Sequence, residues 1–337
     1  MSSILRCLWI CLFATVLLAL LLGIFVLHLT TLPVHTPGKK VRVHIQPGQS
    51  FAQITDLLAR KEVIRDPLLF QAVAMATGMS TRIQAGEFDI NSGWTRVRIL
   101  RTLTSGSEVV YTLSIPEGLT CWETGRLVGK SGLTSARALH RAVHDPKLLA
   151  EFHIPAASAE GYLFPETYIL PRPQQGNAEP ILRMMLDQFR TQISTHIWPG
   201  TLPNPQRIHR LVTLASLVEK ETSLARERRR VAGVYVNRLQ RGMRLQCDPT
   251  VIYGLGKDFS GNLTKKDLKD SENLYNTYRH SGLPPGPICS PGLASLQAAA
   301  DPEEHDYLYF VSKGNGSHHF SRSLREHNLA VRRYQLR

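Results

Sequence analysis

Cysteine is scarce in this sequence, with five residues among 337. There is no CxxC pair and no cluster of cysteine and histidine with zinc-like spacing, so a disulfide scaffold and a structural zinc site are both disfavoured. Cys7 and Cys11 lie in an apolar N-terminal stretch, which leaves Cys121, Cys247 and Cys289 for the rest of the chain. Because three thiols cannot all pair with one another, we assign no disulfide.

Signatures of nucleotide and hydrolase chemistry are also missing. The sequence contains no Walker loop, no Rossmann fingerprint and no GxSxG elbow, and these absences disfavour the enzymes that depend on them. His318, His319 and His327 come nearest to a metal site. They lack the helical i, i+4 spacing of metal ligands, and no carboxylate cluster joins them. We therefore expect neither a metal nor another cofactor.

Acidic residues are outnumbered, with 27 Asp and Glu against 40 Lys and Arg, for a formal net charge of +13. Arg6 is the only charged side chain before residue 35, so nearly all of the excess lies beyond the N-terminal stretch. A basic protein favours polyanions such as nucleic acid, anionic lipid headgroups or acidic cell-wall polymers, and charge alone does not choose among them. The length and the 43% hydrophobic content exclude disorder and fit roughly two domains.

One long hydrophobic run is present. Residues 7–27 contain no charge, and at about 1.5 Å per residue they reach roughly the 30 Å of a bilayer hydrocarbon core. The run predicts a transmembrane helix; a cleaved signal peptide is the alternative, but its apolar part is usually about 7 to 15 residues long. Basic residues on both sides leave the orientation open. We expect a short cytoplasmic tail over residues 1–6, the membrane helix over 7–29 and a linker over 30–40.

A small module is predicted after the linker. The alternating hydrophobicity of residues 41–45 predicts a strand, Ser50 can cap a helix, a second helix begins at Pro67, and residues 83–90 predict another strand. This β-α-α-β content over residues 41–105 makes a small α+β module that resembles the glycan-binding LysM module. The alternative is a spacer that binds nothing.

Residues 106–337 mix helices with loops and predict a larger, mixed α/β domain. The expected elements are helices over 181–193, 205–226 and 231–239, a loop over 282–292, and a strand over 307–311. The loop has four prolines and three glycines in eleven residues, which forbid regular structure. The fold class expected for the whole chain is α+β, with a single N-terminal transmembrane helix, the small module and this larger domain.

The helix expected over residues 205–226 carries the most unusual acids. It is apolar on nearly every side over residues 211–218 and then meets Glu219 and Glu221. At about 100° per residue, Glu219 shares a face with small and hydroxyl residues, whereas Glu221 follows leucine and valine side chains. The two acids therefore point about 200° apart. Small neighbours leave room for a ligand beside Glu219, while Glu221 is expected to be packed or paired.

Glu219 is therefore the catalytic candidate. A carboxylic acid beside apolar walls has its charged form disfavoured, which raises its pKa and suits it to donate a proton near neutral pH. The alternative is that Glu219 merely begins the exposed end of the helix. Five further polar residues are candidates for binding a substrate, although each could instead act as a cap or turn former. They are Glu166, Gln246, Asp248, Asn276 and Tyr278.

Several long motifs, in order, resemble the MltG or YceG-like family of endolytic murein transglycosylases. They are EGYLFPETY, LASLVEKET, VYVNRLQRGMRLQCDPTVIYGLG, YNTYRHSGLPPGPICSPG, and LYFV followed by HHF, and they fall within residues 40–335. The resemblance implies a single-pass inner-membrane protein of bacteria, with a periplasmic catalytic domain over residues 106–337 and a LysM-like module next to the membrane. It puts the first glutamate of the VEKE motif at Glu219. Cys247 departs from the family, in which a threonine is familiar in LQTDPT.

The reaction implied by the resemblance is cleavage within nascent peptidoglycan glycan strands after N-acetylmuramic acid. Most glycosidases need two carboxylates. A lytic transglycosylase needs one, because the sugar's own C6 hydroxyl closes on C1 and a tethered nucleophile replaces a positioned water. The product then ends in 1,6-anhydro-N-acetylmuramic acid, and the five polar residues would bind sugar or orient Glu219.

Two alternatives to this lytic enzyme remain. A membrane-tethered protein with a LysM-like module could hold peptidoglycan without cutting it, and a muramidase would leave a reducing end. The expected partners are glycan strands, the membrane through the single anchor, and proteins of cell-wall synthesis. Nucleic acid is disfavoured by the anchor and by the absence of a recognition motif.

Overall fold

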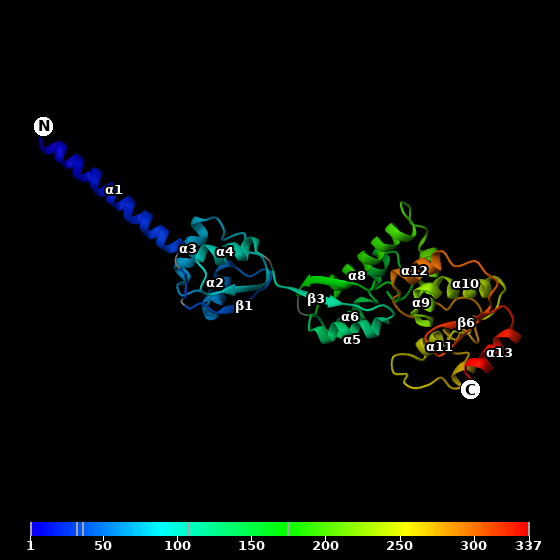
Figure 1. Cartoon of the computed structure of the whole chain (residues 1–337). Coiled ribbons are helices and arrows are strands. Elements are labelled where there is room, and N and C mark those ends of the chain that lie inside the picture. Colours follow the sequence, from blue (N-terminus) through cyan, green and yellow to red (C-terminus); the bar gives the residue numbers. More distant parts are fainter. Residues whose placement is uncertain (1, 32, 36, 107, 174–175, 336–337) are drawn as a thin grey trace. The chain divides into compact units, whose positions relative to one another are not determined.

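The computed structural model describes residues 2–31, 33–35, 37–106, 108–173 and 176–335. The chain divides into two compact units, unit 1 with residues 1–111 and 170–172, and unit 2 with residues 112–169 and 173–337. Helices predominate, and the strands of the described residues pair two by two into small sheets (Figure 1). This composition confirms the predicted α+β class.

The N-terminal helix α1 covers Ser2–Thr31. Within the described residues, no helix is both long and apolar enough to cross a membrane. The predicted transmembrane helix over residues 7–29 is therefore wrong, and so is the predicted single-pass inner-membrane localisation.

Unit 1 has a β-α-α-β arrangement followed by one more helix. In chain order the elements are β1 (Lys40–Ile45), α2 (Phe51–Arg60), α3 (Pro67–Ala76), β2 (Gly86–Asn91) and α4 (Arg96–Ser105). The hydroxyls of Ser50 and Thr95 cap α2 and α4 by accepting from N–H groups three residues later, and Pro67 occupies the first position of α3. Local sequence signals therefore set where these helices begin.

The core of unit 1 lies between its sheet and its helices. β1 and β2 pair antiparallel, with Val43 opposite Phe88. Because side chains alternate along a strand, both point to one face, where they meet Leu58, Phe70 and Leu100 from the three helices. All five side chains are fully buried. Unit 1 thus has a hydrophobic core of its own.

From residue 110 onward the chain is mostly helical. Its elements are β3 (Val110–Ser114), α5 (Cys121–Ser131), α6 (Ala136–Ala142), α7 (Pro146–Glu151), β4 (Thr167–Pro171), α8 (Glu179–Gln192), the π-helix η1 (Ile193–Ile197), α9 (Pro205–Glu221), α10 (Ala225–Gln240), α11 (Asp248–Leu255), the 3-10 helix η2 (Asp267–Lys269), α12 (Leu293–Ala300), β5 (Tyr309–Ser312), β6 (His318–Ser321) and α13 (Leu324–Tyr334). β3 pairs with β4, and β5 pairs with β6.

The central helix of unit 2 is α9. Its residues 211–218 are all buried, and it packs against α10, α11 and α12. Asn204 caps its start, and Thr222 ends it in an extended conformation. The predicted continuation of this helix to residue 226 is wrong, because the Thr222 hydroxyl instead accepts from the N–H of Leu224 at 3.1 Å in the turn before α10.

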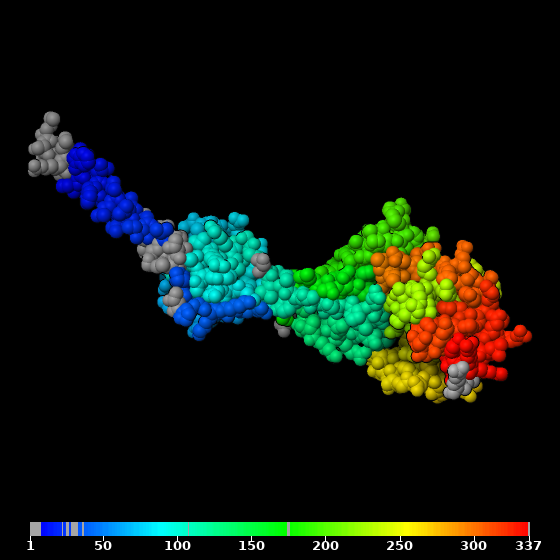
Figure 2. Space-filling view, viewed as in Figure 1, coloured from blue at the N-terminus to red at the C-terminus, as the bar shows by residue number. Residues whose placement is uncertain are grey.

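The strands β5 and β6 form an antiparallel hairpin, with Phe310 opposite Phe320. The turn between them contains Gly314 and Gly316, both with a φ of 80°, a conformation that glycine adopts without steric cost. α13 packs against both strands, and α10 packs against β5. In Figure 2 the red surface of α13 lies beside the orange-red surface of the hairpin. The hairpin thereby connects the end of the chain to the central helices.

Candidate active site

A polar cavity of about 580 Å³ lies at the C-terminal end of α9. Elements far apart in the sequence meet there, namely α9, α10, α11, the β5–β6 hairpin and α13. The titratable and amide side chains that line the cavity include Glu221, Arg238, Gln246, Asp248, Tyr278, His318 and His327. Such a concave site with several convergent polar groups is the usual setting for chemistry on a bound substrate.

Glu221, the last residue of α9, lines this cavity. The hydroxyl of Tyr235 donates to its Oε1 at 2.8 Å. Burial raises the pKa of the Glu221 carboxyl and the charge of Asp248 raises it further, while hydrogen bonds from Cys247 and Tyr235 act in the opposite direction. A carboxyl group with a raised pKa beside a polar cavity is suited to give a proton to a bound substrate.

Three of the five predicted substrate-binding residues, Gln246, Asp248 and Tyr278, line the same cavity. Tyr278 donates its hydroxyl to Oδ1 of Asp248 at 2.6 Å, and burial raises the pKa of Tyr278, so the hydroxyl keeps its proton. Gln246 has a left-handed backbone with a φ of 51° and donates its N–H to the carbonyl of Thr277 at 3.2 Å. The LQCDPT and YNTYRHSG motifs therefore meet at this cavity beside Glu221.

The other two predicted residues lie elsewhere. Asn276 is fully buried, and its amide donates to main-chain carbonyls within residues 267–270. Its side-chain oxygen accepts from the N–H of Tyr278 at 3.0 Å, so Asn276 supports the main chain of a residue in the cavity wall. Glu166 is exposed beside β4, where it accepts from the N–H of Thr167 at 3.0 Å. Neither Asn276 nor Glu166 is part of the cavity lining.

Glu219 does not line the cavity either, although it is only two residues from Glu221. The N–H of Gly292 donates to its Oε2 at 3.0 Å, and Nη2 of Arg228 lies 3.7 Å from its Oε1. The same nitrogen lies 3.9 Å from Oε2 of Glu117. Burial raises the pKa of Glu117, and the charge of Glu219 raises it further. Two carboxylates thus share one arginine on the other face of α9.

The proline-rich loop of residues 282–292 packs against this other face of α9. The Ser216 hydroxyl accepts from a loop N–H at 3.0 Å. Ser290 exchanges two main-chain hydrogen bonds, each of 2.8 Å, with residues 118–119. Glu219 therefore belongs to a group of contacts that fastens the loop to the central helix.

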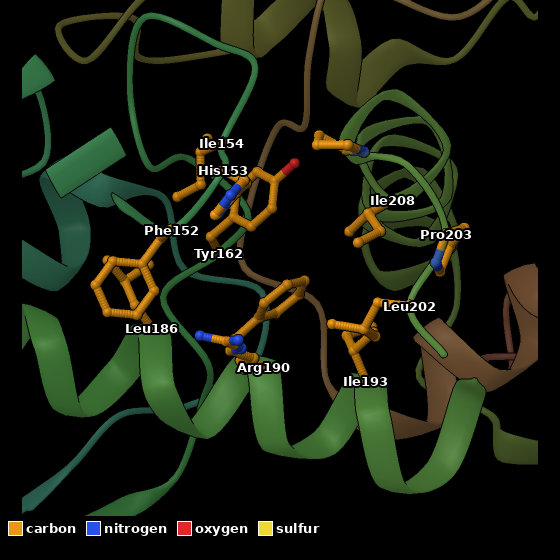
Figure 3. A pocket seen from close by; sticks show the side chains of 12 residues that line it. Phe152, His153, Ile154, Tyr162, Leu186, Arg190, Ile193, Leu202, Pro203 and Ile208 are labelled. Atoms are coloured by element: carbon orange, nitrogen blue, oxygen red, sulfur yellow. The ribbon is translucent and has the colours of Figure 1, made fainter. Parts of the chain in front are cut away.

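A second cavity in unit 2, of about 230 Å³, is mainly apolar. Figure 3 shows Leu186, Arg190 and Ile193 reaching it from α8 and η1, with Tyr162 on another wall. The Tyr162 hydroxyl lies 3.0 Å from Nδ1 of His209. None of the residues that line this cavity is Asp or Glu, so it offers no carboxylic acid for cleaving a glycosidic bond.

Three side chains near the two faces of α9 were not predicted as functional from the sequence. Glu117 precedes α5, Glu227 lies in the first turn of α10, and His318 begins β6. Glu227 is 6% exposed, and the signal that could have found it is a single acid inside a run of four arginines. His318 stands out in the sequence only as part of the HHF motif and as a disfavoured metal ligand, because its neighbours in space are distant in sequence.

Comparisons with known proteins agree over most of the chain. The family described as YceG-like matches residues 43–333. An endolytic murein transglycosylase of Bacillus subtilis is 33% identical over 318 residues, which cover 90% of this chain and 87% of that protein. One from Streptococcus pneumoniae is 28% identical and covers 89% of this chain, but 59% of that longer protein. A crystal structure of a yceG-like protein from Listeria monocytogenes has a TM-score of 0.56 and 30% identity, covering 87% of this chain and 99% of that one. The chain belongs to the YceG-like family.

Proposed function

We propose that this chain is an endolytic murein transglycosylase that cleaves peptidoglycan glycan strands, with Glu221 as its acid. One observation carries the choice of residue: the Glu221 carboxyl, whose pKa burial raises, lines the polar cavity together with Gln246, Asp248 and Tyr278. The reaction class is supported by relatives named endolytic murein transglycosylase, which align with about nine-tenths of the chain.

In the proposed reaction Glu221 acts first as an acid. Its carboxyl gives a proton to the oxygen that bridges N-acetylmuramic acid and the next sugar, and the bond from that oxygen to C1 breaks. The C6 hydroxyl of the same sugar then closes on C1 and forms a 1,6-anhydro end. Because this nucleophile is tethered to the reacting carbon, no positioned water is required. In the simplest cycle, the Glu221 carboxylate takes the proton that the hydroxyl releases.

The polar neighbours of Glu221 are proposed to bind the sugar. Gln246 and Asp248 are exposed residues of the cavity wall, so their amide and carboxylate groups are available to sugar hydroxyls. Tyr278 orients Asp248 through its 2.6 Å hydrogen bond. Asn276 acts indirectly by supporting Tyr278, and a sugar contact of Glu166 stays a prediction from the sequence.

Glu219, the acid that the sequence favours, is the rival proton donor. Its carboxylate is occupied by the Gly292 N–H and lies near the Arg228 guanidinium. These contacts suit it to fastening the loop of residues 282–292. A direct comparison of the two acids therefore tests the assignment.

Glu221→Gln keeps the shape of the side chain and removes the proton, so we expect kcat to fall at least about 10³-fold while the fold is kept. Glu219→Gln should reduce stability more than turnover, because the loop loses a charged partner. The measurements are turnover of uncrosslinked glycan strands and thermal unfolding of the full chain. Normal turnover by Glu221→Gln together with an inactive Glu219→Gln would return the acid role to Glu219.

The products of the wild type test the reaction itself. A lytic transglycosylase adds no water, so its anhydro ends are lighter by one water than hydrolysed ends. Mass spectrometry of digested glycan strands distinguishes the two. Reducing ends would identify a muramidase, and binding without cleavage would identify the non-catalytic alternative.

We propose in addition that unit 1 is a LysM-like, glycan-binding module. Its order of elements, β1-α2-α3-β2, and its separate core support an independent binding unit. Proteins that synthesise the cell wall are the partners that this substrate implies.

A further inference from the structure

A buried contact between a histidine and a carboxylate adjoins the cavity. His318, the first residue of β6, lies with Nδ1 2.8 Å from Oε2 of Glu227, and its main-chain N–H donates to Oε1 of the same carboxylate at 3.2 Å. The two side chains are only 11% and 7% exposed. One carboxylate on α10 therefore holds both the main chain and the ring of His318.

This contact fixes the orientation of the imidazole. A carboxylate only accepts hydrogen bonds, so Nδ1 carries a proton, and in the neutral ring Nε2 is left with a lone pair. Among the described residues we find no hydrogen-bond partner for Nε2. The ring lines the polar cavity that also contains Glu221. His318 thus offers an acceptor nitrogen in the cavity of the proposed acid.

Aromatic packing also holds the imidazole ring of His318 in place. Phe310 meets it edge to face, with ring centroids 5.4 Å apart. The next residue, His319, points to the opposite face of the strand, where its ring lies 5.8 Å from that of Tyr334. His319 is not part of the cavity lining. The sequence therefore supplies a matched control one residue away.

We propose that His318 is a second catalytic residue, which takes the proton from the C6 hydroxyl of N-acetylmuramic acid, with Glu227 as its positioning residue. The proposal rests on the proposed function. It leaves proton donation to the bridging oxygen with Glu221 and gives removal of the C6 hydroxyl proton to His318. A His base held by a carboxylate is an arrangement that favours such a transfer, because the carboxylate orients the ring and stabilises the imidazolium that forms.

The step balances as follows. Glu221 gives its proton to the bridging oxygen, which leaves with the electron pair of its bond to C1. The C6 oxygen forms the new bond to C1, and its proton passes to Nε2 of His318. The imidazolium, paired with Glu227, then returns this proton to the Glu221 carboxylate through water. The cycle needs no oxidant, reductant or added co-reactant.

Several charged or titratable groups share the cavity wall with His318. They are Glu221 from α9, Arg238 from α10, Asp248 from α11, Tyr278, Tyr309 from β5 and His327 from α13, in addition to its partner Glu227. A histidine base must be unprotonated, so kcat should rise with pH along the acidic side of the pH profile. The loss of the imidazole should remove that rise, although the other groups stay in place.

The experiment uses the full chain and uncrosslinked glycan strands. His318→Asn keeps a side-chain N–H for Glu227 but has nothing in place of Nε2. We expect kcat to fall about 10²-fold, KM to change little, and the acidic limb of the pH profile to disappear. Glu227→Gln should lower kcat by less than His318→Asn does, because the ring keeps a hydrogen-bond partner and loses only the charge of that partner. His319→Asn should match the wild type in all three quantities.

His318→Gln brings an amide near the position of Nε2 and cannot titrate, so it gives a second test if His318→Asn does not fold. An unchanged kcat, a change in KM alone, or a persisting acidic limb in the soluble His318 variant would overturn the proposal. Failure of the proposed function has a separate signature, namely reducing ends from the wild type or normal turnover by Glu221→Gln. Anhydro ends from the wild type with an inactive Glu221→Gln and a normal His318 variant would reject the role of His318 alone.

Discussion

Glu160 is a buried acid that the proposed chemistry does not use. It is 5% exposed, and it accepts from the N–H of Cys121 at 3.0 Å and from the hydroxyl of Tyr253 at 3.2 Å. Burial raises its pKa to about 7, although these donors act in the opposite direction. The folded chain therefore keeps a proton at pH values where the unfolded chain has released it.

We expect Glu160 to make the wild type less stable as the pH rises from 4.5, which is the ordinary pKa of a glutamate side chain, to about 7, which is the pKa of Glu160 in the folded protein. The difference amounts to about 3 kcal/mol in the free energy of unfolding. The variant Glu160→Gln cannot ionise at this position, so its stability should lack this part of the pH dependence. Urea unfolding below and above this pH range measures the difference. The exposed acid Glu166 provides the control, because the variant Glu166→Gln should keep the same pH dependence of stability as the wild type. The same pH dependence in all three proteins would assign it to other groups.

At the scale of residues, the sequence predicts helix faces better than it predicts cavities. The helical period predicts that Glu219 and Glu221 lie on different faces of α9. Their hydrogen-bond partners do differ, since Glu219 accepts from the N–H of Gly292 whereas Glu221 accepts from the hydroxyl of Tyr235. The expected room beside Glu219 is occupied by the loop of residues 282–292. That contact joins residues 73 positions apart, and the pattern of a single helix contains no information about it.

At the scale of elements, the loop of residues 282–292 shows how a segment without regular structure can be part of the core. Its prolines and glycines forbid a helix or strand, as predicted, yet Ile288, Cys289 and Ser290 are at most 1% exposed. Buried N–H groups need partners inside the protein. The hydroxyl of Ser216 on α9 accepts from one of them, the N–H of Ile288, and the carbonyl of Leu119 accepts from another, the N–H of Ser290.

Ser216→Ala should reduce the free energy of unfolding by about 1–3 kcal/mol, because the buried N–H of Ile288 loses its acceptor. Urea denaturation of the full chain measures the change. Ser223 is exposed just after α9, and Ser223→Ala should stay within about 0.5 kcal/mol of the wild type. Equal stability of the two variants would mean that other contacts hold the loop.

At the scale of the whole molecule, the two units have separate cores. The described core of unit 1 draws on residues 34–103, with further apolar side chains packed around it. Unit 2 has its own buried helix α9, which packs against neighbours of the same unit. A deletion confined to unit 1 should therefore leave the polar cavity intact.

We expect deletion of residues 41–105 to raise KM for glycan strands at least about tenfold, because a linked binding module raises the effective substrate concentration. The deletion should lower kcat much less. Steady-state kinetics and co-sedimentation with peptidoglycan provide the two readouts. If KM and co-sedimentation both match the intact chain, unit 1 is a spacer rather than a binding module.

At this scale the order of motifs predicts the family, which the match over residues 43–333 confirms. The membrane helix, which was predicted from a long apolar run and from the family resemblance, was wrong, because no helix of the described residues meets the requirements for crossing a bilayer. The cavity could not be predicted from the sequence. Its wall combines the end of α9 with β6 and α13, and only tertiary packing brings these segments together.

The helix α13 forms one side of the polar cavity. Leu324, His327, Asn328 and Val331 of this helix belong to the cavity wall, and α13 packs against both strands of the β5–β6 hairpin. Detachment of α13 from the hairpin would remove this part of the wall and expose Glu221 more widely to bulk water. Access to the proposed acid therefore depends on the packing of a single helix of 11 residues.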